Sequence, residues 1–87
     1  MERKLDLAQT KDTIQKNIAP YVGANMARAS TQAHCERLGL DGDTITPGQL
    51  TSLLDRLAKA MRVFVGPQTT SDVVRAIERD VLGKGST

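Results

Sequence analysis

The chain has 87 residues, of which 39% are hydrophobic and 25% are charged, and its formal net charge is +2. This composition is typical of one small globular domain and argues against a disordered chain. Charges of both signs alternate along most of the sequence, and the apolar stretches are too short to span a membrane. The single cysteine, Cys35, cannot form an internal disulfide, and the start lacks an apolar signal segment, so we expect a cytoplasmic protein.

The first half of the chain predicts a pair of helices over residues 5–38. The first is expected over residues 5–19, because Pro20 disfavours its continuation. The second is expected over residues 24–38, where Gly39 ends it. The apolar face of the first helix comprises Leu7, Ile14, Ile18 and Tyr21. The candidate inner face of the second comprises Met26, Ala27, Ser30, His34 and Leu38.

Residues 39–47 are expected to link this pair to a second helix pair over residues 48–82, followed by a flexible tail at 83–87. The start of the third helix shows a capping-box pattern that begins at Thr46, with proline at the first helical position and glutamine three residues after the cap. All three signals predict that the third helix begins directly after Thr46. The whole chain is therefore expected to be a single helical domain.

Gly66 and Pro67 predict the end of the third helix, and the fourth helix is expected to close at Gly83. The third helix has the most regular apolar stripe in the chain, with three- and four-residue spacing. That stripe comprises Leu50, Leu53, Leu54, Leu57, Met61 and Phe64. The apolar face of the fourth helix comprises Val73, Val74, Ile77 and Val81.

The two aromatic residues, Tyr21 and Phe64, lie 43 residues apart in matching phrases. Each follows an apolar residue and two spacers, and each is followed by Val-Gly. Aligning the halves on these phrases places His34 opposite Ile77, so the second helix is a more polar copy of the fourth. The repeat predicts an all-α fold, either a four-helix bundle or two pseudo-symmetric helical hairpins. Chance similarity in a chain rich in Leu and Val is the alternative.

His34, Cys35 and Glu36 form the one place where a base, a nucleophile and an acid adjoin. Adjacent residues on a helix do not face each other, so no catalytic hydrogen bond is expected between them. One cysteine and one histidine cannot form a structural zinc site, and the Asp-Gly-Asp sequence at 41–43 lacks most ligands of a calcium loop. We therefore expect no enzymatic activity, no cofactor and no metal site.

DNA binding is the alternative function. The third and fourth helices could form a helix-turn-helix, in which the start of the fourth helix would contact bases. Acidic residues on that helix and the small net charge count against phosphate binding. The residues that would contact nucleic acid are Gln68, Thr69, Thr70, Ser71, Arg75 and Arg79.

The Pro-Tyr-Val-Gly sequence at 20–23, followed by Met-Ala-Arg-Ala at 26–29, resembles small helical modules appended to bacterial signalling proteins such as serine/threonine kinases. The second half repeats the phrase as Phe-Val-Gly-Pro at 64–67. The first copy departs from the second at Ala24, which stands where Pro67 stands. The resemblance implies an accessory interaction domain of bacterial origin and includes no catalytic signature.

Together these patterns predict a non-catalytic protein–protein interaction or dimerisation module in bacterial signalling or regulation. It would act as a homodimer or docked to a larger protein, with no membrane partner. A half-polar helix face can be exposed in the free protein and buried on binding, although it can also be the weaker side of an intramolecular core. The expected partner-binding residues are Met26, Ser30, His34 and Leu38.

Overall fold

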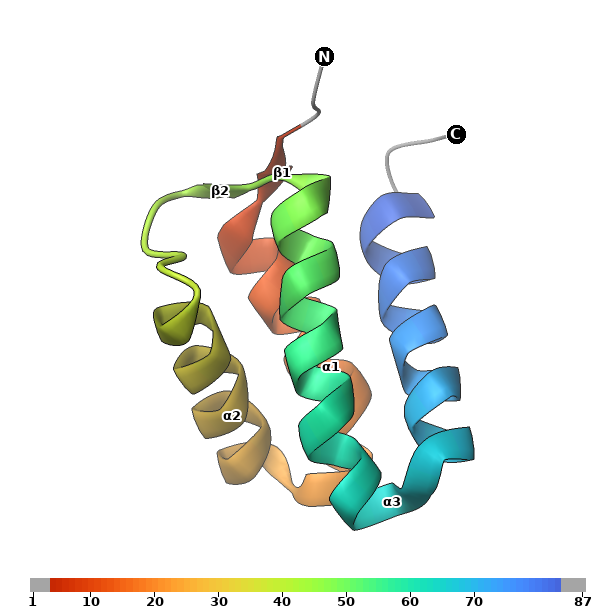
Figure 1. Cartoon of the computed structure of the whole chain (residues 1–87). Helices are drawn as coiled ribbons and strands as arrows, with labels where there is room; N and C mark the ends of the chain where they lie inside the picture. Colours follow the sequence, from red (N-terminus) through yellow and green to blue (C-terminus); the bar gives the residue numbers. More distant parts are fainter. Residues whose placement is uncertain (1–3, 84–87) are drawn as a thin grey trace.

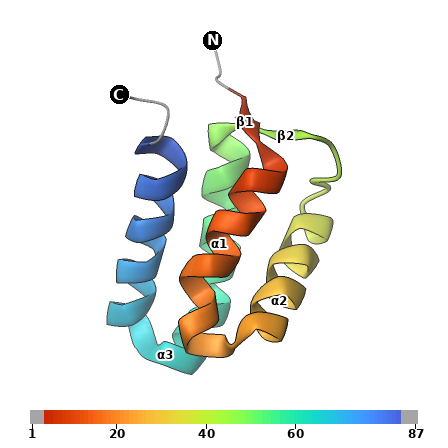
Figure 2. The ribbon, with the colours of Figure 1, turned by 180° about the vertical axis from the view of Figure 1, so that it is seen from behind.

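The computed structural model describes residues 4–83, which form three α-helices and two short β-strands. In chain order the elements are β1 (Leu5–Asp6), α1 (Leu7–Val22), α2 (Ala24–Arg37), β2 (Thr44–Ile45) and α3 (Pro47–Gly83). The predicted all-α class is therefore confirmed. Figure 1 shows the helices side by side, and Figure 2 shows the same arrangement from behind, with α1 in front. Residues 84–87 of the expected tail lie outside the described residues.

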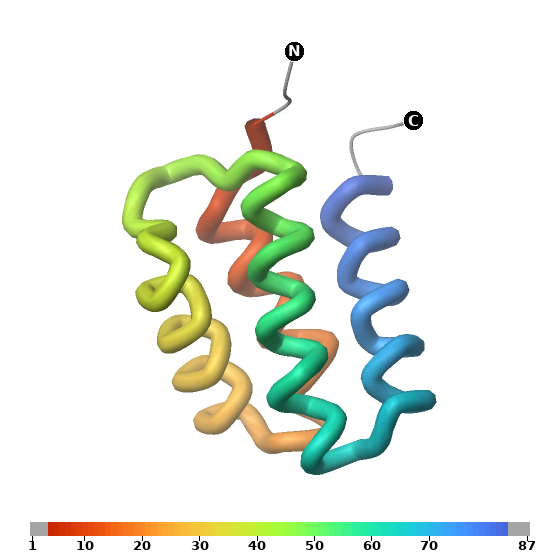
Figure 3. Tube along the Cα trace, in the orientation of Figure 1, coloured from red at the N-terminus to blue at the C-terminus, as the bar shows by residue number. Residues whose placement is uncertain are grey.

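α3 reverses its direction inside its own span. Gly66 has φ 82° and ψ 168°, which lie outside the helical region. The Cα trace in Figure 3 shows that the parts of α3 before and after this residue run side by side in opposite directions. We term residues 47–65 the first arm and residues 67–83 the second arm. The sequence predicts two separate helices here, and the structure has two helical arms separated by non-helical backbone at the expected glycine, within the single span labelled α3.

The start of α3 follows the predicted capping box. The Thr46 hydroxyl oxygen accepts a hydrogen bond from the Gln49 backbone N–H at 3.2 Å, and the Gln49 side-chain carbonyl accepts one from the Thr46 N–H at 2.9 Å. Each bond satisfies a backbone donor that has no helical partner. α1 begins with a similar cap, because the Asp6 carboxylate accepts from the Gln9 N–H at 3.0 Å.

The strands are absent from the sequence-based prediction. Leu5 pairs with Ile45 and Asp6 with Thr44 in an antiparallel register. α1 consequently begins at Leu7 rather than at residue 5, and β2 lies inside the expected linker. Two-residue strands are too short to show an alternating pattern, so periodicity cannot reveal them. The pairing ties the start of α1 to the segment that leads into α3.

The ends of α1 and α2 also differ from the prediction. α1 continues through Pro20 to Val22, three residues beyond its expected end. A proline in the last turn removes only one helical hydrogen bond, and the Gly23 N–H then donates to the Ala19 carbonyl at 2.7 Å. α2 ends at Arg37, one residue before its expected end.

The predicted apolar stripes supply most of the aliphatic core. The buried hydrophobic residues are Leu7, Ile14, Ile18, Ala27, Cys35, Leu40, Ile45, Leu50, Leu53, Leu54, Leu57, Met61, Val73 and Ile77. The core prediction is wrong at Tyr21, Met26 and Phe64, which are exposed. These three lie close to Gly23 or Gly66, where the stacked helices end, so helical spacing alone places them with the core although little packs over them.

Threonine side chains fill core positions that an apolar pattern does not identify. Thr10, Thr31 and Thr70 are buried. Their hydroxyls donate to the carbonyls of Asp6, Ala27 and Gly66, one turn earlier, at 2.8, 2.8 and 2.7 Å. This local bond satisfies the hydroxyl and leaves its methyl group to pack. Within residues 4–83, no helix is both long enough and apolar enough to cross a membrane.

Candidate functional site

Four large apolar side chains are exposed at one end of the molecule. The exposed fractions are 50% for Tyr21, 50% for Met26, 82% for Val63 and 68% for Phe64. They lie next to the turn between α1 and α2 and the reversal of α3, which Figures 1 and 2 show close together at the same end. We term these four residues the apolar end. Grouped exposed apolar side chains are characteristic of interaction surfaces.

Two glycines create this end. Gly23 has φ 89° and ψ 157°, close to the values of Gly66, and such angles are accessible almost only to glycine. A Cβ built on either residue meets nothing within 4 Å, so the backbone conformation, not a lack of space, requires glycine. Each glycine stops a helix two residues after an aromatic side chain. Tyr21 and Phe64 are therefore left at matching helix ends.

α2 presents its predicted partner-binding residues at the edge of the core rather than inside it. Met26 is exposed, whereas Ser30, His34 and Leu38 are half-buried. Leu38 also packs against the core. The fully buried positions of α2 are Ala27, Thr31 and Cys35. The inner face is therefore rotated relative to the prediction, and the small residues spaced four apart were the signal that could have identified it.

His34 lies in a positively charged environment. Burial lowers the pKa of its imidazole, and the nearby charges of Arg56 on α3 and Arg37 on α2 lower it further. Nδ1 of His34 and Nε of Arg56 are buried and have no hydrogen-bond partner within residues 4–83. Buried polar atoms are normally paired. These two nitrogens therefore lack a hydrogen-bond partner within residues 4–83, and the charges that shift the pKa of His34 are positive.

Positive charge also borders the apolar end. No Asp or Glu occurs in residues 13–35 or 56–71, which we term the acid-free segments because they contain both turns. Lys16 and Lys59 pair with Asp12 and Asp55, which lie just outside these segments, at 3.0 and 3.2 Å. The remaining cations of the acid-free segments form no ion pair in the described part of the chain. They are Arg28 near the α1–α2 turn, Arg62 near the reversal of α3, and Arg56, which lies further along the first arm and close to His34; we term these three residues the cationic rim.

The side chains of the His34–Cys35–Glu36 sequence differ in their burial. Cys35 is fully buried, and burial raises the pKa of its thiol, an effect that the charge of Lys11 partly offsets. No hydrogen bond joins the Cys35 thiol to His34 among the described residues. A raised pKa disfavours the thiolate that nucleophilic chemistry needs. A search of the described residues finds no group of three metal-ligating side chains.

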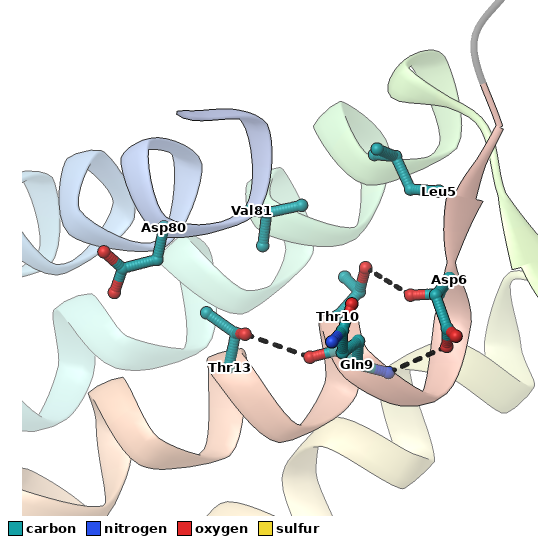
Figure 4. A pocket seen from close by; sticks show the side chains of 7 residues that line it. All are labelled: Leu5, Asp6, Gln9, Thr10, Thr13, Asp80 and Val81. Carbon is teal, nitrogen blue, oxygen red and sulfur yellow. Dashed lines mark hydrogen bonds between the residues drawn. The ribbon is translucent and has the colours of Figure 1, made fainter. Parts of the chain in front are cut away.

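A shallow groove lies at the other end of α1, between β1 and the second arm (Figure 4). It is lined by Leu5, Asp6, Gln9, Thr10, Thr13, Asp80 and Val81. The Thr10 and Thr13 hydroxyls donate to backbone carbonyls, at 2.8 and 3.0 Å. The carboxylate of Asp80 accepts from the Asn17 amide at 3.3 Å. These polar groups serve the start of α1 and its contact with α3, so the groove has a structural explanation.

The residues proposed for DNA binding are only partly accessible. Gln68, Ser71, Arg75 and Arg79 are exposed, Thr69 is half-buried and Thr70 is buried. The two arms of α3 run alongside each other (Figure 3), whereas the helices of a helix-turn-helix cross at about 90–120°. Exposed acidic residues share the second arm with these positions. The arrangement therefore favours helix packing over insertion into a groove of DNA.

Comparison with protein families, with curated proteins and with solved structures gave no match. The resemblance of the glycine phrases to bacterial accessory modules therefore stays a prediction. Among the surfaces described above, the apolar end with the adjoining edge of α2 is the strongest candidate for a functional site.

Proposed function

We propose that this chain is a small non-catalytic protein–protein interaction module. Its binding surface would be the apolar end together with the edge of α2 formed by Ser30, His34 and Leu38. The observation that carries the proposal is the exposure of Tyr21, Met26, Val63 and Phe64, which lie near the two turns at one end of the molecule (Figure 1). Covering such side chains removes apolar surface from water, which is the main driving force of protein association.

The binding surface would be assembled by two pseudo-symmetric helical hairpins. One hairpin is α1 with α2, and the other consists of the two arms of α3. Equivalent positions 43 residues apart support this description, because Ile14 and Leu57 are both buried, as are Ile18 and Met61. Each hairpin contributes one turn and one aromatic residue to the apolar end.

A regulatory setting follows from the same features. The glycine phrases resemble accessory modules of bacterial signalling proteins, and a module of this kind acts in the cytoplasm through contact with a second copy or with a larger protein. Within residues 4–83, Cys35 is buried with a raised thiol pKa and has no hydrogen bond to His34, which supports a binding role over a catalytic one.

The proposal is tested by affinity capture from the native cell extract, combined with sedimentation equilibrium of the isolated chain. Met26→Asp places a charge on the apolar end at an exposed position. Leu38→Asp is a weaker test, because Leu38 also packs against the core. We expect Met26→Asp to reduce capture or self-association while its circular dichroism stays helical. The proposal would be contradicted if Met26→Asp captured the same proteins as the wild type and if both the wild type and Met26→Asp had a monomeric mass.

A further inference from the structure

The charge around the apolar end indicates what chemistry would bind there. Arg28 follows Met26 by two residues, and Arg62 directly precedes Val63. Neither guanidinium group forms an ion pair within residues 4–83, although Asp12, outside the acid-free segments, lines the same groove as Arg28. An apolar surface bordered by positive charge is complementary to one bordered by negative charge.

We infer that the occupant of the apolar end is an amphipathic segment of another protein, with aliphatic or aromatic side chains flanked by Asp or Glu. This inference rests on the proposed function and adds the chemistry of the partner. Its apolar side chains would cover the apolar end, and its carboxylates would contact the cationic rim. Arginine binds carboxylates through paired hydrogen bonds, so the rim would also orient the segment.

A second observation, on the boundary between α2 and α3, indicates the same chemistry. The unpaired nitrogens of His34 and Arg56 lie where Arg37 adds further positive charge. A carboxylate placed beside Arg56 would balance that charge and, after a side-chain rotation, accept from its Nε–H group. A hydrogen bond from the Arg56 Nε–H group to a carboxylate requires a defined direction. It therefore favours a peptide with a fixed carboxylate over a diffuse anionic surface.

Other occupants fit this surface less well. Two copies that met through their apolar ends would bring their cationic rims together, and like charges disfavour an interface. An anionic membrane surface would attract the rim, but it would place no fixed acceptor beside Arg56. Nucleic acid would also match the charge, and the rings of Tyr21 and Phe64 could stack on bases, but it would leave the aliphatic side chains of Met26 and Val63 in water.

The test uses the whole chain and a labelled helical peptide of about 18 residues, with Leu along one face and Glu on both flanks. A matched peptide carries Lys in place of each Glu. Fluorescence anisotropy should show that the Glu peptide binds at least about tenfold more tightly than the Lys peptide. Binding of the Glu peptide should weaken as NaCl is added, because salt screens the charges.

Charge reversal gives the sharper readout. Arg62→Glu should weaken binding of the Glu peptide about tenfold or more and strengthen binding of the Lys peptide. Arg79→Glu, on the exposed side of the second arm, is the matched control and should leave both affinities unchanged. The bound Glu peptide should also raise the pKa of His34, which is observable because the chain has one histidine.

Equal affinity for the two peptides would overturn the inference and leave a docking function standing. Binding of neither peptide would overturn it, as would tighter binding to phosphatidylserine vesicles or to duplex DNA than to the Glu peptide. Dimers of the chain alone that dissociate on Val63→Asp substitution would assign the apolar end to a second copy instead. Failure of the proposed function itself would appear separately, as unchanged capture by Met26→Asp.

Discussion

Gly23 and Gly66 adopt nearly the same backbone conformation, with φ 89° and ψ 157° at the first and φ 82° and ψ 168° at the second. Both residues follow an aromatic-Val pair, and both reverse the chain at the same end of the molecule (Figure 1). One local geometry thus occurs once in each half. It explains why Tyr21 and Phe64, which belong to apolar stripes by spacing, are exposed.

Gly66→Ala and Gly23→Ala are each expected to destabilise the protein by about 1–3 kcal/mol, because alanine is strained at these angles. Open space around both positions means that the cost comes from the backbone alone. Urea denaturation measures the loss. Gly42→Ala is the matched control, because Gly42 also has open space but no positive φ. A loss as large at Gly42 would contradict the account.

Thr46→Ala should lower the free energy of unfolding by about 1 kcal/mol, since it removes the side-chain acceptor at the start of α3. Thermal and urea denaturation both detect a change of this size. Ser52→Ala, at an exposed position inside α3, should have much less effect. If the two variants were equally stable, the capping box would contribute nothing.

Leu57→Ala and Phe64→Ala separate core from surface within one apolar stripe. Leu57 is 2% exposed, and its truncation should cost about 2–5 kcal/mol. Phe64 is 68% exposed, so Phe64→Ala should cost less than about 1 kcal/mol. Similar losses for the two variants would show that Phe64 is packed and would remove it from the apolar end.

The stability of the protein should depend on the ionisation of His34. Burial, together with Arg56 and Arg37, lowers its folded-state pKa below the ordinary value of 6.5. The unfolded chain then binds a proton more readily than the folded one, so stability is lost as pH falls through 6.5 toward the folded-state pKa. NMR titration of the single histidine gives that pKa directly.

Two variants control this titration. His34→Gln should abolish the loss of stability in that pH window. Arg56→Gln should move the pKa of His34 upward, because it removes the larger of the two charge effects on the imidazole. A His34 pKa at or above 6.5 in the native protein would contradict the structure around α2.

Short sequence patterns were sufficient to predict those features that depend on only a few adjacent residues. The cap at Thr46 and the reversal at Gly66 each depend on a few adjacent residues, and both lie where predicted. The β1–β2 pairing and the exposure of Phe64 depend on which segments meet in space, so helical spacing could not reveal them. Thr31 was missed because its buried hydroxyl is satisfied by the preceding turn.

Of the four residues of the apolar end, the sequence singled out only one as a candidate for partner binding. Met26 was predicted as a partner-binding residue, which stays a prediction, and it is exposed near the turn between α1 and α2. Val63 was not identified, because a single exposed valine in a helix has no distinctive pattern. Its significance appears only when the two turns lie at one end of the molecule.

The most direct test of the interaction surface compares Val63→Asp with Leu82→Asp in affinity capture from the native extract. Both residues are exposed and apolar, but Val63 belongs to the apolar end and Leu82 lies near the far end of α3. We expect Val63→Asp to lose the proteins retained by the wild type, and Leu82→Asp to keep them, with both variants folded. Retention of the same proteins by Val63→Asp would contradict the proposed binding surface.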